Sequence, residues 1–166
     1  MKLLKFFTLA LCLACFTQLS AQNTLPDVNV KTLDGKTVNI QDFGKNGKIT
    51  IISFWATWCS PCKKELDAVA DLYPEWQEKY DVEFLAITID NARALPKVGP
   101  MVDVKQWEYT ILSDSKEELK RALNFQTVPY TLVIDQKGNI VDKHSGYVAG
   151  DEYELEDKIK KLAAKK

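Results

Sequence analysis

The stretch that decides the fold is FWATWCSPCKKE, residues 54–65, because two different hydrophobic patterns meet there. Before the junction, Lys48–Ala56 (KITIISFWA) is an almost unbroken apolar and β-rich run, which is typical of a strand buried on both faces of a parallel sheet. After it, apolar residues recur at steps of three and four over Pro61–Tyr80, which predicts an amphipathic helix with a kink at Pro74. The stretch therefore predicts a buried strand that leads directly into a helix.

Cys59 and Cys62 form a C-x-x-C motif at this junction. Cys59 is expected at the helix N-terminus, where free backbone N–H groups and the positive end of the helix dipole favour a thiolate. The thiolate is the attacking species in disulfide exchange, and Cys62, one helical turn later, can displace the resulting mixed disulfide. Pro61 suits the first turn because its missing N–H costs nothing there. The alternative, a pair of inert core cysteines, fits poorly with a position after Trp58 at a strand–helix junction.

The composition indicates one globular domain. The chain has 166 residues, of which 46% are hydrophobic and 27% are charged, so it is neither disordered, collagen-like nor a multi-span membrane protein. Its 22 basic and 23 acidic residues give a net charge of -1, which argues against nucleic-acid binding.

Residues 1–21 are predicted to be a secretory signal peptide. A short basic start is followed by an apolar run at residues 6–16 that is too short to span a bilayer stably, and the small residues Ser20 and Ala21 favour cleavage after Ala21. One alternative is a lipoprotein signal in which Cys15 becomes lipidated, and another is a retained N-terminal anchor. Either exported form places the protein in the periplasm, in solution or anchored through Cys15.

Removal of the signal changes the cysteine count. Cys12 and Cys15 also spell C-x-x-C, but both lie in the apolar signal core, so only Cys59 and Cys62 remain in the mature chain. Loss of two lysines leaves 20 basic and 23 acidic residues, a net charge of -3.

The rest of the chain alternates strand and helix patterns, which indicates a single α/β domain. Strands are expected at residues 27–30, 37–40, 82–89, 130–135 and 139–144. The first two form a hairpin around an Asp-Gly turn at residues 33–36, and the last two are joined by a turn at 135–138. A short helix is expected near residues 101–107, and a terminal helix at 151–164. A third helix is expected to begin at a capping box, Ser115–Glu118, and to end near Leu123. The hydrophobic pattern breaks between Asn91 and Tyr109.

The segment at residues 54–65 strongly resembles the active-site segment of the thioredoxin superfamily, and in particular of its exported branch, the TlpA/ResA-type thiol–disulfide oxidoreductases. The resemblance covers most of the mature chain. It implies a thioredoxin-like domain at residues 22–166: a central mixed sheet flanked by helices, with an N-terminal β-hairpin and an insertion after the second core strand, roughly Asn91–Tyr109. Thr127-Val128-Pro129-Tyr130-Thr131 matches the loop of this family in which the proline is cis and faces the redox cysteines.

The resemblance also implies roles for individual residues. Cys59 and Cys62 would be the catalytic pair, and the substrate would be bound by Trp58, Ser60, Pro61, Val128 and Pro129. Cytoplasmic thioredoxins carry a buried Asp where this chain has Ser53, whereas the exported branch has a Glu where this chain has Glu65. Glu65 shares a helical face with Cys62 and would handle its proton, and partial burial should raise its pKa. The alternative is a solvated acid on the helix surface.

The predicted function is the reduction of protein disulfides, with apocytochrome c as one candidate substrate and a membrane thiol donor as the source of electrons. The protein is expected to be a monomer and to need no cofactor besides its redox-active disulfide, and no metal. A thiol peroxidase is one alternative, although Ala56 stands where that chemistry uses Thr or Ser. A copper- or metal-binding module is another, although two cysteines and the single His144 fall short of a zinc ligand set. His144 is predicted to have a surface or hairpin role.

Overall fold

The computed structural model describes residues 23–165. The predicted signal peptide, including Cys12 and Cys15, lies outside these residues, so it stays a prediction. Among the described residues, no helix has the length and apolar character needed to cross a membrane.

Within this part of the chain, one mixed sheet has the strand order β2-β1-β5-β4-β3-β6-β7. The strands are β1 (Asn29–Thr32), β2 (Thr37–Asn39), β3 (Ile49–Trp55), β4 (Val82–Thr88), β5 (Thr110–Ser113), β6 (Tyr130–Ile134) and β7 (Ile140–Ser145). The helices are η1 (Ile40–Lys45), α2 (Ser60–Tyr80), η2 (Leu95–Lys97), α3 (Val98–Lys105), α4 (Glu118–Leu123) and α5 (Asp151–Ala163). The thioredoxin-like architecture expected from the sequence is confirmed.

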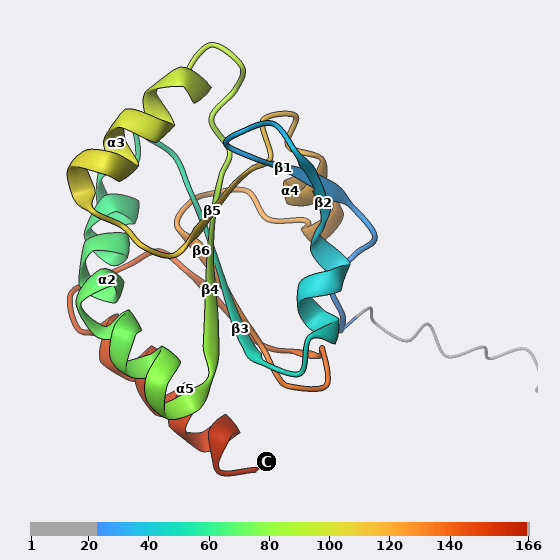
Figure 1. The fold of residues 1–166 in the computed structure, drawn as a ribbon, viewed down its shortest axis with the longest axis vertical. Coiled ribbons are helices and arrows are strands. Elements are labelled where there is room, and N and C mark those ends of the chain that lie inside the picture. The colour runs from blue at the N-terminus through green and yellow to red at the C-terminus, as the bar shows by residue number, and fades with distance from the viewer. Residues whose placement is uncertain (1–22, 166) are drawn as a thin grey trace, which may run out of the picture.

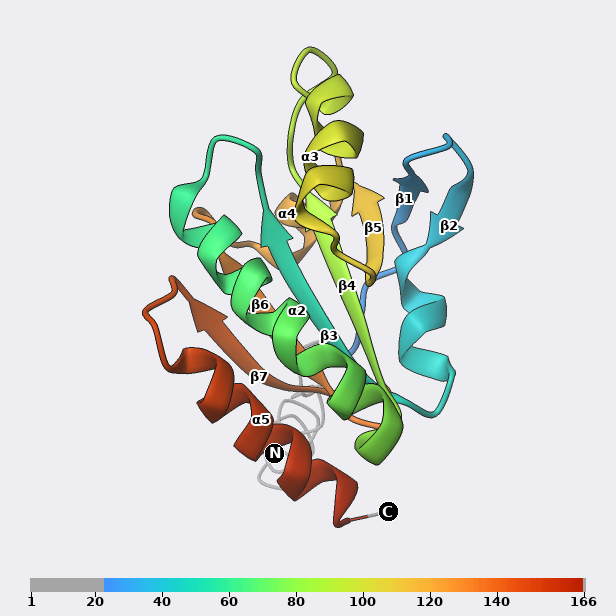
Figure 2. The same cartoon turned by 60° about the vertical axis from the view of Figure 1, so that its left-hand side comes forward.

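Helices cover the sheet on both faces. Figure 1 shows the sheet edge-on, with α2, α3 and α5 on one side and α4 and η1 on the other. In Figure 2, α2 and α5 lie next to each other in front of the sheet, and β7 forms the sheet edge beside α5. The hairpin of β1 and β2 forms the opposite edge and turns through Gly35 at φ +87°.

The centre of the sheet forms where the apolar run predicts it. All seven residues of β3 are buried, and β3 pairs in parallel with β4 and antiparallel with β6. The chain enters α2 five residues after β3 ends, and α2 continues through Pro74 to Tyr80. Asp81 closes the helix in the left-handed conformation at φ 52°. This junction places the C-x-x-C motif at the carboxyl end of the central strand.

Three local expectations are corrected. First, β5 is a strand that the hydrophobic periodicity does not reveal, because four residues are too few for a clear pattern. Second, α3 spans Val98–Lys105 and not 101–107. Its first turn takes Pro100 because the first N–H groups of a helix have no intrahelical partner.

The third correction concerns the start of α4. No capping box forms at Ser115–Glu118, because the Asp114 carboxylate is the group that caps the helix. It accepts the backbone N–H groups of Leu119 at 3.2 Å and Lys120 at 2.9 Å.

Candidate active site at the N-terminus of helix α2

Cys59 occupies the N-cap of α2, as predicted, and is joined to Cys62 by a disulfide. The backbone N–H of Cys62 donates to Cys59 Sγ at 3.3 Å, and the N–H of Cys59 donates to the carbonyl of Ala56 at 2.9 Å. Cys59 keeps 4% of its surface exposed, whereas Cys62 is fully buried. Free N–H groups and the dipole of a 21-residue helix therefore point at Cys59, the outer of the two sulfurs.

The loop before β6 lies against this disulfide. The Val128–Pro129 peptide bond is cis, as the resemblance implies, and the carbonyl oxygen of Val128 lies 3.7 Å from Cys59 Sγ. The Pro129 carbonyl accepts the N–H of Gly146 at 2.9 Å, which ties the loop to the end of β7. Two segments far apart in the sequence thus meet at one sulfur atom.

The residues expected to bind substrate surround Cys59 at the surface. Trp58 is 68% exposed, Ser60 and Pro61 are exposed, and Val128 is half-buried. Pro129 itself is buried beneath them. An extended peptide can reach this rim from solvent, and its contact with these residues is a prediction.

Asp90 is a site residue that the sequence reasoning missed. Its carboxylate accepts the N–H of Thr57 at 2.8 Å and the Thr57 hydroxyl at 2.9 Å. The hydroxyl of Thr88 donates to the same carboxylate at 2.7 Å, while Lys63 Nζ donates to the Thr57 carbonyl at 3.1 Å. Asp90 is nearly fully buried, and it anchors the turn that presents Cys59. The available sequence signal was an acidic residue directly after the predicted buried strand, residues 82–89.

Glu65 is buried under the sheet, with 5% of its surface exposed, which excludes a solvated surface acid. Its carboxylate accepts hydrogen bonds from Ser53 Oγ at 2.9 Å and Thr131 Oγ1 at 2.6 Å. Burial raises the pKa of Glu65, and the hydrogen bonds from Thr131 and Ser53 oppose that rise. The direction of the predicted shift is confirmed, and its cause is desolvation. The hydroxyl partner Thr131 was not predicted, although it stands in the quoted loop motif.

Within the described residues, no group of three or more His, Cys, Asp or Glu side chains gathers in a way that could hold a metal ion. Ala56, which the peroxidase alternative would need as Thr or Ser, is a fully buried methyl at the carbonyl that Cys59 contacts. The Cys59–Cys62 disulfide at the N-terminus of α2 offers dithiol–disulfide exchange.

The comparisons with known proteins agree with this arrangement. A sequence profile of the AhpC/TSA family matches residues 21–143. The chain is 35% identical to the thioredoxin-like protein YneN of Bacillus subtilis over 130 residues, which are 78% of this chain and 74% of that protein. It is 30% identical to the thiol-disulfide oxidoreductase ResA of Bacillus thuringiensis subsp. konkukian over 139 residues, 82% of this chain and 75% of ResA.

Solved structures give the same result. An uncharacterized thioredoxin-like protein from Porphyromonas gingivalis superposes with a TM-score of 0.75 at 41% identity, covering 84% of this chain and 92% of that one. StoA from Bacillus subtilis superposes with a TM-score of 0.64 at 26% identity, covering 80% and 98%. The chain therefore belongs to the AhpC/TSA family of thioredoxin-like proteins, and within it the protein is a thiol–disulfide oxidoreductase of the TlpA/ResA type.

Proposed function

We propose that the protein is exported and reduces disulfides of other proteins in the periplasm. The observation that carries the proposal is the placement of Cys59 at the N-cap of α2 and against the Val128 carbonyl, with Cys62 buried one turn behind it. A substrate strand laid along residues 128–129 would bring its disulfide to Cys59, the outer sulfur, while Cys62 stays enclosed behind it. The resemblance to ResA-type proteins supports the same direction of electron flow.

The reaction has two exchange steps. The Cys59 thiolate attacks one substrate sulfur, and the other substrate sulfur leaves as a thiolate that takes up a proton. Cys62 then loses its proton and attacks Cys59 Sγ, which forms the Cys59–Cys62 disulfide and releases the second substrate thiol. The substrate gains two electrons and the protein loses two, so a thiol donor must reduce the disulfide before the next cycle. Apocytochrome c and a membrane thiol donor are the candidate partners.

Glu65 is proposed to accept the proton of Cys62. It lies one turn along α2, and it is held by Ser53 and Thr131 in a site that solvent hardly reaches. A carboxyl group with a raised pKa is closer to an effective general base at neutral pH than an exposed one.

The first test uses the protein from residue 22 onward, as expected after cleavage. It should contain one reversible intramolecular disulfide, two thiols after reduction, and dithiothreitol-driven insulin reductase activity. Measurement of the reduction potential in a glutathione or dithiothreitol buffer determines the direction of electron flow, that is, whether the protein acts as a reductase or as an oxidase. Thiols that stay unreactive in the folded protein would exclude the redox function, and a strongly oxidising potential would reverse the direction.

The second test addresses Glu65. Glu65→Gln keeps size and hydrogen-bonding capacity but cannot titrate, so insulin reduction should slow by about tenfold or more and its pH profile should change. Glu78→Gln, an exposed position on the same helix, is the matched control and should behave as wild type. Equal rates for Glu65→Gln and wild type across pH would leave Glu65 a purely structural group.

A further inference from the structure

The pairing of β3, β6 and β7 places His144 in the same row as the residues that hydrogen-bond the buried carboxylate of Glu65. Ser53 of β3 pairs with Thr131 of β6, and Thr131 pairs with His144 of β7. Paired residues of neighbouring strands project from the same face of the sheet, so these three side chains form one row. Glu65 takes hydrogen bonds from the first two members of this row. The third member is the only histidine in the chain.

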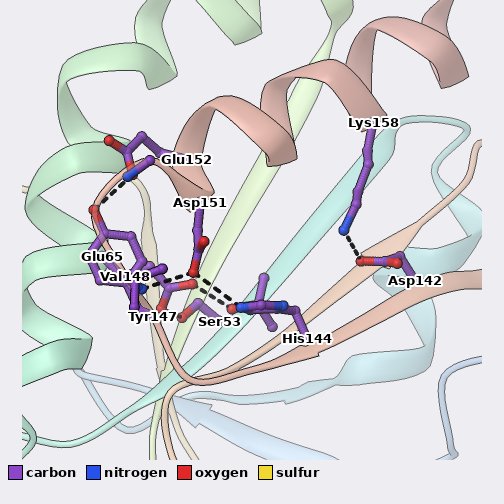
Figure 3. Close-up of polar contacts among 11 residues, drawn as sticks. Ser53, Glu65, Asp142, His144, Tyr147, Val148, Asp151, Glu152 and Lys158 are labelled. Carbon is purple, nitrogen blue, oxygen red and sulfur yellow. Dashed lines mark hydrogen bonds and ion pairs between the residues drawn. The ribbon is translucent and has the colours of Figure 1, made fainter.

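Glu65 and His144 both line one small cavity. It has a volume of about 30 Å³ and is lined by Glu65 and Val69 from α2, by Thr131 and His144 from the sheet, and by Asp151 from α5. This volume is enough to hold a water molecule. Figure 3 shows Glu65 at one end of this group of side chains and the pair of His144 and Asp151 toward the N-terminus of α5.

His144 and Asp151 form the solvent-facing end of this cavity. The imidazole Nε2 lies 3.2 Å from Asp151 Oδ2, and the same carboxylate oxygen accepts the N–H of Val148 at 2.9 Å. The side chain of His144 is 44% exposed, so the ring contacts both the cavity and solvent. An imidazole is the side-chain group that exchanges protons most readily near neutral pH.

The other charged groups around the cavity are engaged elsewhere or face solvent. Lys158 pairs with Asp142 at 2.6 Å. Glu152 accepts the Tyr147 hydroxyl at 2.8 Å and the N–H of Gly150 at 2.9 Å, and Glu154 is exposed. β3 and β6 contribute Ser53, Thr131 and Val133 on this side, none of them charged.

The electrostatic effects on Glu65 agree with this geometry. A positive charge on His144 lowers the pKa of Glu65 and the negative charge of Asp151 raises it, both less than burial does. A positive charge on His144, in the same row of side chains, thus acts on the buried carboxylate of Glu65.

We propose that His144, oriented by Asp151, transfers the proton of Glu65 between the cavity and solvent. The inference rests on the proposed role of Glu65. In the oxidising half of the cycle, the Cys62 thiol proton moves to the Glu65 carboxylate, then to the His144 imidazole, and from there to solvent or buffer. In the reducing half, the proton returns by the same route. His144 is a positioning residue, because it acts through Glu65.

The test is chemical rescue of His144→Ala. Its insulin reductase rate at pH 7 should fall about tenfold, and added imidazole should restore it in proportion to the imidazole concentration. Lys143→Ala is the matched control: it alters the adjacent residue of β7, whose side chain alternation places it on the opposite face, and it should keep the wild-type rate. His144→Gln, which preserves packing and hydrogen bonding, should also be slow and should shift the pH profile.

Glu65→Gln separates the two proposals. Once Glu65 cannot titrate, His144→Ala should slow turnover no further and imidazole should have no effect. If Glu65→Gln is slow while His144→Ala and His144→Gln are as fast as wild type, the relay is wrong and the role of Glu65 stands. If the His144 variants are slow without imidazole rescue and with an unmoved pH profile, His144 is structural and the relay is also wrong.

A second inference rests on an independent feature, a groove between α2 and α3. Its volume is about 570 Å³, it begins at Ser60 beside Cys59, and its apolar wall includes Met101 and the 82% exposed Val104. Four lysines line it: Lys63, Lys64, Lys97 and Lys105. Its single acid, Asp67, is already paired with Lys105 at 2.6 Å and accepts the Trp107 indole N–H at 3.0 Å. The groove is therefore positive on a chain whose net charge is -1.

We infer that this groove, here called the lysine groove, receives an acidic segment of the protein substrate next to the substrate cysteine. Charge complementarity selects the occupant, and Met101 and Val104 add apolar contact. Lys64 and Lys97 are exposed, and no ion pair or hydrogen bond with another side chain of the described residues engages their ammonium groups.

The test compares disulfide-bonded peptides that differ only in acidic, neutral or basic residues beside one cysteine. The acidic peptide should have the highest kcat/KM, mainly through a lower KM. The double substitution Lys64→Gln and Lys97→Gln should lower kcat/KM for the acidic peptide about fivefold without changing the rate on the neutral peptide. The preference should fade at high salt. Lys116→Gln with Lys137→Gln, exposed lysines elsewhere, is the control. Equal kcat/KM for all three peptides in the wild type would exclude the acidic occupant while leaving disulfide reduction intact.

Discussion

At the scale of single residues, the two cysteines differ in position more than in chemistry. Cys59 receives the N–H of Cys62 and meets the Val128 carbonyl at the surface, whereas Cys62 is fully enclosed between α2 and the sheet. A bulky protein disulfide can approach only the outer sulfur. The attacking and the resolving roles should therefore belong to Cys59 and Cys62 respectively.

This assignment predicts that Cys62→Ser accumulates stable mixed disulfides with protein substrates, because the resolving thiol is missing while Cys59 still attacks. Non-reducing electrophoresis and mass spectrometry of the linked peptides would identify Cys59 as the bonded residue. Cys59→Ser is the matched variant and should trap little, since Cys62 is enclosed. Trapping by Cys59→Ser and not by Cys62→Ser would exchange the two roles.

At the scale of elements, helix ends hold the site and its surroundings in place. The N-terminus of α2 stabilises the Cys59 sulfur, and Asp90 fixes the turn before it through Thr57. Asp114 performs a similar structural task for α4, where it satisfies two backbone N–H groups of the first turn. In both cases the anchoring carboxylate stands just beyond the end of a central strand, at the same edge of the sheet as the disulfide.

Asp114→Ala should lower the free energy of unfolding by about 1–2 kcal/mol, as loss of a helix cap does. Ser115→Ala, at the position where the sequence predicts the cap, should change it by less than about 0.5 kcal/mol. Urea unfolding of the oxidised proteins measures both. A larger loss for Ser115→Ala than for Asp114→Ala would favour the capping box over the observed cap.

At the scale of the whole molecule, the sheet and α2 together enclose an ionisable group at a cost in stability. Burial raises the pKa of Glu65 above its ordinary value of 4.5, so the folded state binds the Glu65 proton more tightly than the unfolded state does. The stability contributed by Glu65 is therefore complete at low pH and is lost as the pH rises from about 4.5 through the folded-state pKa. The burial of the Glu65 carboxylate therefore lowers the stability of the fold at neutral pH.

Glu65→Gln should accordingly unfold at a higher temperature than wild type at pH 7, and the difference should shrink as the pH falls through the raised folded-state pKa of Glu65 toward about 4.5. Thermal unfolding of the oxidised proteins across pH measures this. Glu78→Gln, on the exposed face of α2, should follow the wild-type curve at every pH. A Glu65→Gln variant that is less stable than wild type at neutral pH would mean that its hydrogen bonds to Ser53 and Thr131 outweigh the burial of its charge.

The sequence by itself determined the features that depend on near neighbours in the chain. The apolar run before Cys59 and the 3.6-residue pattern after Cys62 report a strand and a helix, and their junction places Cys59 at the N-cap. The hairpin around Gly35 and the turn at Gly138, with φ +84°, likewise follow from local backbone requirements. The cis Pro129 followed from the resemblance carried by its loop.

Only the tertiary structure decided which distant residues share a site. Thr131 is 66 positions from Glu65, and Val128 is 69 positions from Cys59, so no periodicity in the chain connects them. β5 is too short to show a pattern and becomes a strand because β4 and β1 pair with it. His144 looks like an ordinary residue on an edge strand until the register of β3, β6 and β7 sets it in the row of Ser53 and Thr131. Hydrophobic patterns report which face of an element is buried, and the packing of the elements decides which side chains meet there.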